Sequence, residues 1–166
     1  IIMEIAKELH SELIDFILDA EGDLAASLES FSAEQLANFS QSQYQGAVQN
    51  EMILNMFLTE GMVGNKTPVD IFLESHPDLS TEKCDIVNNF RRSFAGLFAV
   101  NKIYDDGFEL TNWLTDKTYT VKINEAEQQQ LKRAKSGEIL LARIVPLTNN
   151  DWMFSSTVTL MGRLGK

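Results

Sequence analysis

The side chains best suited to metal binding or covalent catalysis are few and widely spaced. The sequence contains two histidines, His10 and His76, and a single cysteine, Cys84. Zinc sites draw their ligands from cysteine and histidine at short spacing, and no CxxC pair occurs here. His76 stands at the expected end of a helix, where a histidine interacts favourably with the helix dipole. We therefore predict no metal site and no cofactor.

Sequence motifs of nucleotide binding and nucleophilic catalysis are also missing. The chain has no GxxxxGK[ST], GxGxxG or GxSxG pattern. Asp105 and Asp106 could serve as an acid–base pair or hold a cation. Because Gly107 follows them, we interpret them as turn residues. The sequence therefore favours a protein that is not an enzyme. We keep one enzymatic alternative, an enzyme of unrecognised type. It would use Arg91, Arg143 and an acidic residue, at a site between the helices expected in the first half of the chain and the barrel expected in the second.

Aromatic and basic side chains in the second half of the chain could form a binding surface. Small barrels bind single-stranded nucleic acid by stacking bases on aromatic rings and neutralising phosphates. Tryptophan more often packs in a core, however, and cations at a helix end complement the helix dipole. We take as the tentative binding surface the residues Arg91, Arg92, Trp113, Arg143 and Trp152.

The charge of the chain is strongly asymmetric. The 166 residues carry a net charge of −10, and the pI is about 4.6. Residues 1–90 hold three basic and sixteen acidic side chains, whereas residues 91–166 hold eleven basic and eight acidic ones. Affinity for DNA comes largely from neutralised phosphates, so this balance disfavours nucleic acid as the ligand. We expect a protein partner, with nucleic acid as the alternative.

The first half of the chain has the apolar spacing of helices. We predict helices over 2–20, 33–39, 51–61, 68–75 and 80–94. Ser32 with Gln35 has the form of a capping box. Thr67 followed by Pro68 and Asp70 is a strong helix start. The glutamine-rich stretch 40–50 is a candidate hinge or the start of a loosely packed helix.

In the second half the apolar period changes to two. We predict strands over 96–104, 108–114, 117–123, 138–146 and 152–160, with a polar, helix-prone connector over 124–137. Asp105-Asp106-Gly107 indicates a hairpin. The fold class is therefore α+β: an acidic helical region over 1–94, then a small antiparallel β-barrel or sheet of about five strands over 95–166. We expect the two regions to pack together.

The sequence lacks the features of membrane and secreted proteins, so we expect the chain in the cytoplasm. No run of apolar residues is long enough to span a membrane, and the first residues do not form a signal peptide. A single cysteine cannot form an internal disulfide, which is typical of a cytoplasmic protein. The first residue is Ile rather than Met, so we expect a piece of a longer protein.

Several stretches together resemble a bacterial family of uncharacterised proteins, in the form found in cyanobacteria. The resemblance rests on MILNMFLTEG, GNKTPVDIFLE, SFAGLFAV, GFELTNWLTDKTYTV and SGEILLARIVPL and covers about residues 50–160. Relatives of that family occur alone or beside zinc-binding SEC-C motifs, whose cysteines this chain lacks. Where members often have Asp-Leu-Leu-Thr-Gly, this chain has Asn-Trp-Leu-Thr-Asp over 112–116. The resemblance implies the helix-then-barrel plan and no activity. The leading hypothesis is a binding or adaptor module.

Overall fold

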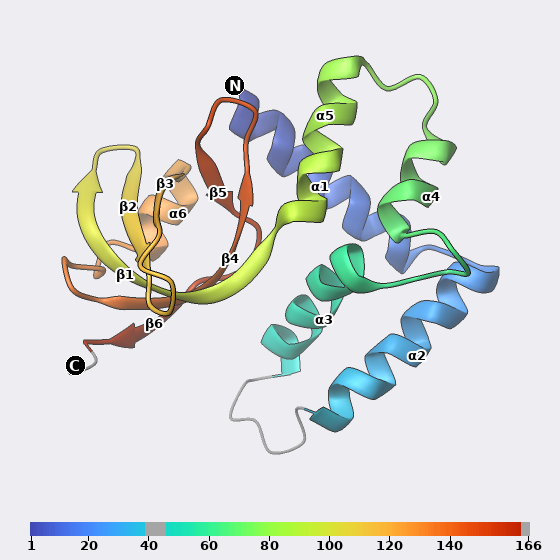
Figure 1. Ribbon diagram of the computed structural model, residues 1–166, viewed down its shortest axis with the longest axis horizontal. Helices are drawn as coiled ribbons and strands as arrows, with labels where there is room; N and C mark the ends of the chain where they lie inside the picture. The colour runs from blue at the N-terminus through green and yellow to red at the C-terminus, as the bar shows by residue number, and fades with distance from the viewer. Residues whose placement is uncertain (39–45, 164–166) are drawn as a thin grey trace. The chain divides into compact units, whose positions relative to one another are not determined.

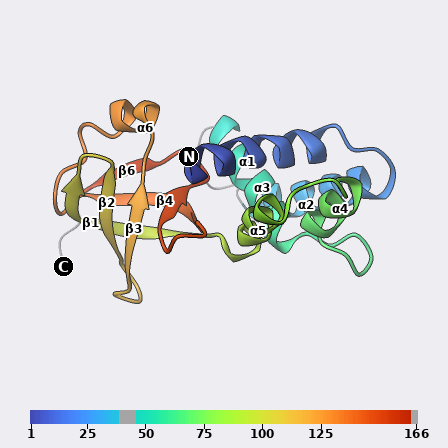
Figure 2. The same cartoon turned by 90° about the horizontal axis from the view of Figure 1, so that it is seen from above.

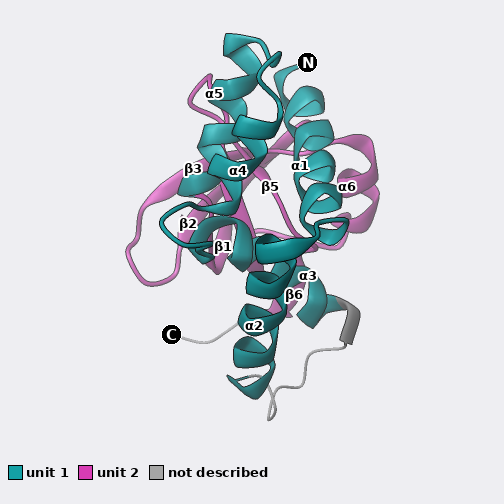
Figure 3. Ribbon diagram, turned by 90° about the vertical axis from the view of Figure 1, so that its right-hand side faces the viewer, with its two compact units in different colours: residues 1–92 teal, residues 93–166 magenta. Residues whose placement is uncertain are grey.

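The computed structural model describes residues 1–38 and 46–163, and the chain divides into two compact units. Unit 1 spans Ile1–Arg92 and unit 2 spans Ser93–Lys166 (Figure 3). The predicted hinge over 40–50 lies mostly outside the described residues. Each unit is described by itself.

Unit 1 is helical (Figure 1). Its elements are α1 (Ile2–Leu18), α2 (Gly22–Asn38), α3 (Gly46–Glu60), α4 (Pro68–Ser75), α5 (Thr81–Asn89) and the short 3-10 helix η1 (Phe90–Arg92). The buried side chains of α1 recur at helical spacing, as the apolar pattern predicted; they are Ala6, Leu9, Leu13 and Ile17. The apolar helix predicted over 51–61 is the body of α3, with Ile53, Phe57 and Leu58 buried. The core of unit 1 also includes Val69 and Phe72 of α4, Ile86 and Val87 of α5, and Phe90 of η1.

Two helix predictions in unit 1 are wrong in detail. Ser32 lies inside α2, which begins ten residues earlier, after Glu21. The capping-box pattern was misleading because Leu24, Leu28 and Phe31 continue the same helical face across it. The helix predicted to run to residue 94 ends at Asn89, and Phe94 is the first residue of a strand.

In the part that the structure describes, up to residue 163, unit 2 has six strands and one helix (Figures 1 and 2). The strands are β1 (Phe94–Tyr104), β2 (Gly107–Asn112), β3 (Thr118–Lys122), β4 (Ile139–Pro146), β5 (Trp152–Phe154) and β6 (Thr159–Gly162). Helix α6 (Glu125–Gln130) lies on the connection between β3 and β4 and starts with a capping box from Asn124 to Glu127. Figure 2 shows α6 to one side of the strands.

The strands close into a five-stranded barrel with β6 as an extra strand. The order is β1-β2-β3-β5-β4, and β1 also pairs with β4, which closes the ring. The pairs β1–β2, β2–β3, β4–β5 and β1–β4 are antiparallel, as predicted. The pair β3–β5 is parallel, with Val121 opposite Trp152, so the barrel is mixed rather than wholly antiparallel. The α+β class and the order of helices before barrel are confirmed.

The fifth predicted strand, 152–160, is broken into β5 and β6. Both parts pair with the same strand, β4, in the same antiparallel sense. Across the break the Ser155 N–H donates to Arg143 O, and the Arg143 N–H donates to Ser156 Oγ, each at 3.0 Å. Serine hydroxyls offer the backbone such alternatives to ladder hydrogen bonds, which explains why the strand stops here.

The barrel interior is filled by apolar side chains from every barrel strand, including Phe98, Leu110, Val121, Leu140 and Phe154. Leu131 and Ala134, which follow α6, join the same core and are nearly inaccessible to solvent. A filled interior leaves the outer faces of the strands as the places where a ligand can bind.

Candidate functional site

The hairpin between β1 and β2 builds an open hollow on the outside of the barrel. Strand register places Tyr104 opposite Gly107, and Gly107 opposite Lys122. Directly paired residues point to the same face of a sheet. Tyr104, Gly107 and Lys122 therefore lie on one face of the sheet, with the glycine between the two larger side chains. Asp105 and Asp106 form the hairpin turn, as the sequence predicted.

Gly107 is required there by the close approach of the neighbouring strand. A Cβ atom built on it would lie 2.1 Å from the carbonyl oxygen of Val121. Real Cβ atoms do not come so near to a backbone oxygen, so β2 and β3 could not keep this spacing with any other residue. Gly107 therefore allows the close spacing of β2 and β3 next to the hollow.

The hollow has a volume of about 820 Å³ and is lined by Ile103, Tyr104, Asp105, Asp106, Thr120 and Lys122. Ile103 is 51% exposed and Tyr104 is 43% exposed, so these two neighbouring residues offer apolar surface to a partner. Lys122 Nζ lies 3.0 Å from Asp106 Oδ2. This hydrogen bond raises the pKa of Lys122, so the ammonium stays charged at neutral pH.

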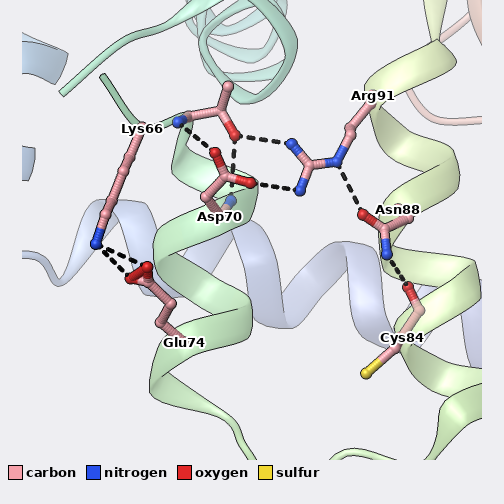
Figure 4. Close-up of polar contacts among 7 residues, drawn as sticks. Lys66, Asp70, Glu74, Cys84, Asn88 and Arg91 are labelled. Carbon is pink, nitrogen blue, oxygen red and sulfur yellow. Dashed lines mark hydrogen bonds and ion pairs between the residues drawn. The ribbon is translucent and has the colours of Figure 1, made fainter. Parts of the chain in front are cut away.

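Arg91 is part of a polar network inside unit 1 (Figure 4). Its Nη1 donates to Thr67 Oγ1 at 3.0 Å, and its Nη2 lies 2.7 Å from Asp70 Oδ1. Its Nε donates to Asn88 Oδ1. The Thr67 backbone N–H, and then Arg91, lower the pKa of Asp70. Arg91 therefore joins the end of α5 to the start of α4.

The other two arginines of the tentative surface have different environments. Arg92, the last residue of η1, is exposed. Arg143 is buried in β4, and its Nη1 donates to Ser93 Oγ at 3.1 Å, just before β1. Arg91 and Arg92 belong to unit 1, whereas Arg143 belongs to unit 2. Within unit 2, Arg143 connects two paired strands.

The two tryptophans are both half-buried. The ring of Trp152 packs edge-on against Tyr119, with 4.9 Å between centroids, and against Phe94 at 5.9 Å. Trp113 follows β2. Its backbone N–H donates to Leu97 O at 2.8 Å, which extends the β1–β2 pairing by one residue. Trp152 thus belongs to an aromatic packing group with Tyr119 and Phe94.

The histidines have ordinary structural partners. The His10 ring stacks on Phe90, and its Nε2 donates to Asn55 Oδ1 at 2.7 Å. His76 Nδ1 donates to Phe72 O at 2.8 Å, and its ring stacks on Phe72. Among residues 1–38 and 46–163, no three His, Cys, Asp or Glu side chains converge in a way that could hold a metal ion.

Sequence reasoning had placed Tyr104 and Lys122 among the aromatic and basic residues of the barrel but not in the tentative surface. The missing information was the strand register. A two-residue turn at Asp105-Asp106 implies that Tyr104 pairs with Gly107, which could have been derived. The pairing of Gly107 with Lys122 could not, because the length of the next turn was not known.

Comparisons with known proteins give no assignment: no family model matches the chain, and no curated protein sequence matches it. The bacterial family resemblance therefore stays a prediction. No helix in the described part of the chain combines the length and the apolar composition needed to cross a membrane.

Proposed function

We propose that the chain is a non-enzymatic binding module whose barrel holds a protein partner at the hollow beside Tyr104. The observation that carries this proposal is the exposure of Ile103 and Tyr104 at a hollow that they line together with Asp106 and Lys122. Tyrosine is enriched among the residues that dominate binding energy at interfaces. A charged rim of Asp106 and Lys122 around an apolar centre is the usual anatomy of such a surface.

The topology of the barrel supports a binding role. The strand order, the closing β1–β4 pair and a helix between the third and fourth strands are the arrangement of OB-fold barrels. Those barrels use the face of their second and third strands and the adjoining loops for binding. The hollow lies on this side of the barrel, at the β1–β2 turn. A shared fold does not assign a function, so the proposal depends on the local geometry.

The charges near the hollow favour protein over nucleic acid. Lys122 pairs with Asp106 at 3.0 Å, and Lys102 lies 3.8 Å from Glu109 on the neighbouring outer face. Both lysines are therefore partly neutralised, and the whole chain carries a charge of −10. A protein partner needs no excess of positive charge, whereas a phosphate backbone does. We assign the module to the cytoplasm, since its single cysteine fits a reducing compartment.

Single-stranded nucleic acid is the second candidate, because one aromatic ring, that of Tyr104, lies exposed beside a lysine. A base could stack on Tyr104 while Lys122 contacts the adjoining phosphate. This binding would fall steeply as salt is added.

The test is an affinity pull-down from native lysate with three forms of the chain: wild type, Tyr104→Ala and Leu114→Ala. Leu114 is 90% exposed after β2 and outside the hollow, which makes it a matched control. We expect a protein partner to be retained by wild type and Leu114→Ala, with at least about a tenfold loss for Tyr104→Ala. Equal retention by all three forms would contradict the proposal. A nucleic acid recovered with the same pattern would favour the second candidate.

A further inference from the structure

A groove lies in unit 1 between α2 and the segment that joins α3 to α4. Its volume is about 540 Å³, and its lining includes Phe31 of α2, Phe57 of α3 and Met62 of the connecting segment. The groove is remote in sequence from the hollow of the barrel and belongs to the other unit.

The floor of the groove is aromatic and firmly held. Phe57 is completely buried, and its ring centroid lies 5.4 Å from that of Phe31. Gly61 lies directly against Phe57, since a Cβ at Gly61 would come within 2.4 Å of the ring. Met62, the next residue, is 52% exposed at the edge. Methionine is flexible and polarizable, which suits it to contact apolar side chains of different shapes.

One edge of the groove contains a hydrogen-bonded turn. The Val63 N–H donates to Lys66 O at 2.8 Å, and the Lys66 N–H donates to Val63 O at 3.2 Å. These two hydrogen bonds fix the local shape of the connecting segment. A preformed groove binds more tightly because little conformational entropy is lost on binding.

Three carboxylates line the groove: Asp23, Glu34 and Glu60. None of them forms an ion pair with another described residue, and no basic side chain lines the groove. Residues 1–65 contain eleven acidic side chains and one basic side chain, Lys7. The potential in the groove is therefore negative, and it would attract a cationic partner and repel an anionic one.

We propose that this groove docks a cationic amphipathic segment of a partner protein. One apolar side chain of that segment packs on Phe31 and Met62 above the Phe57 ring. Lysine or arginine side chains flanking it pair with Glu34 and Glu60. An apolar anchor surrounded by complementary charge combines the two features that give interfaces affinity and specificity. This inference does not depend on the function proposed for the barrel.

The test measures binding of a fluorescent, lysine- and leucine-bearing amphipathic peptide to the whole chain by anisotropy. The variants are Glu34→Lys with Glu60→Lys, Met62→Ala and, as the control, Glu29→Lys. Glu29 is exposed on α2 and does not line the groove. We expect the paired charge variant to lose at least about tenfold in affinity and Met62→Ala about fivefold, with Glu29→Lys within about twofold of wild type. Circular dichroism confirms that each variant folds.

Salt and peptide charge give two further readouts. Binding should weaken at an ionic strength of about 1 M, where the Debye length is about 3 Å. A peptide with glutamate in place of lysine should not bind. Absence of binding by the cationic peptide, or equal losses for Glu29→Lys and the groove variants, would overturn the proposal. So would self-association of the wild-type chain that Glu34→Lys abolishes, because the groove would then hold a second copy.

Discussion

The helical unit and the barrel unit reach their folds by different means. In unit 1 the helix starts are determined by neighbouring residues. At Thr67, for example, both the hydroxyl and the backbone N–H form hydrogen bonds with Asp70, three positions later. In unit 2 the strands depend on partners far away in the chain, as in the pairing of Phe94 with Ile144. Structural features that depend on neighbouring residues can therefore be recognised in a sequence. Features that depend on pairing between distant residues cannot.

The charges of the two units differ as well. Unit 1 carries five basic and sixteen acidic side chains, and unit 2 carries nine and eight. The acidic groove and the nearly neutral hollow therefore suit different partners. The predictions that follow probe the contrast between the units, beginning with the largest expected effect.

Replacing one core phenylalanine in each unit should show that the two cores unfold separately. Phe98 in the barrel and Phe57 in α3 are both completely buried. We expect Phe98→Ala and Phe57→Ala each to lower the free energy of unfolding by about 3–5 kcal/mol. Hydrogen exchange with mass spectrometry should show protection lost mainly over 93–163 for the first and mainly over 1–92 for the second. If either variant lowers the protection of both units equally, the two units unfold together and the prediction is wrong.

Glycine substitutions should cost stability for different reasons in the two units. Gly107→Ala places a methyl group against Val121 O, and we expect a loss of about 1–3 kcal/mol in the free energy of unfolding. Gly64 has open space around it but a φ of +67°. Gly64→Ala should cost about 1 kcal/mol from backbone strain, and Gly64→Asn should cost less because asparagine tolerates that conformation. Thermal unfolding measures the stability of all three variants. A smaller loss of stability for Gly107→Ala than for Gly64→Ala would contradict the steric argument.

The two capped helices of unit 1 allow a finer comparison. Thr67 accepts hydrogen bonds from the Asp70 N–H and from Arg91, whereas Ser80 accepts only one cap bond, from the Lys83 N–H. We expect Thr67→Ala to cost about 1–2 kcal/mol and Ser80→Ala about 0.5–1 kcal/mol in urea unfolding. Equal costs would mean that the Arg91 contact adds nothing to the cap.

The smallest effect concerns pH. Because the pKa of Asp70 is lowered in the folded chain, its carboxylate stabilises the fold above its ordinary pKa of 3.8, and that contribution is lost as the pH falls through the lower folded value. Asp70→Asn should therefore be less stable than wild type at neutral pH, by less than about 1 kcal/mol since the pair is partly exposed. The difference should vanish in acid. A difference in stability that persists unchanged in acid would contradict this account.

The helices and most strands could be predicted because their signals are short. Thr67, Pro68 and Asp70 lie within four positions, and the two-residue turn at Asp105-Asp106 is a local signal too. Ser32 shows the limit of this approach, since a capping pattern occurs there inside a continuous helix.

The candidate site could be predicted only in part. Arg91 was assigned to a binding surface because its partner Asp70, 21 residues away, was not visible in the sequence. The hollow needed the register of three strands, and the acidic groove needed α2 to be placed beside α3. The parallel β3–β5 pair was missed for the same reason, because a sequence does not state which strands close a barrel.

Barrel closure has a consequence for the order of folding. The Ser93–Arg143 contact joins residues 50 apart in the sequence, so a long loop must close before the first and fourth strands stabilise each other. The helix caps of unit 1 join residues only three positions apart, as in Thr67 and Asp70, so no long loop has to close. Topologies rich in distant contacts fold more slowly, so in a refolding experiment helical signal should return before Trp152 reaches its native fluorescence. During synthesis, β1 must wait unpaired on its β4 side until Ile139–Pro146 has been made.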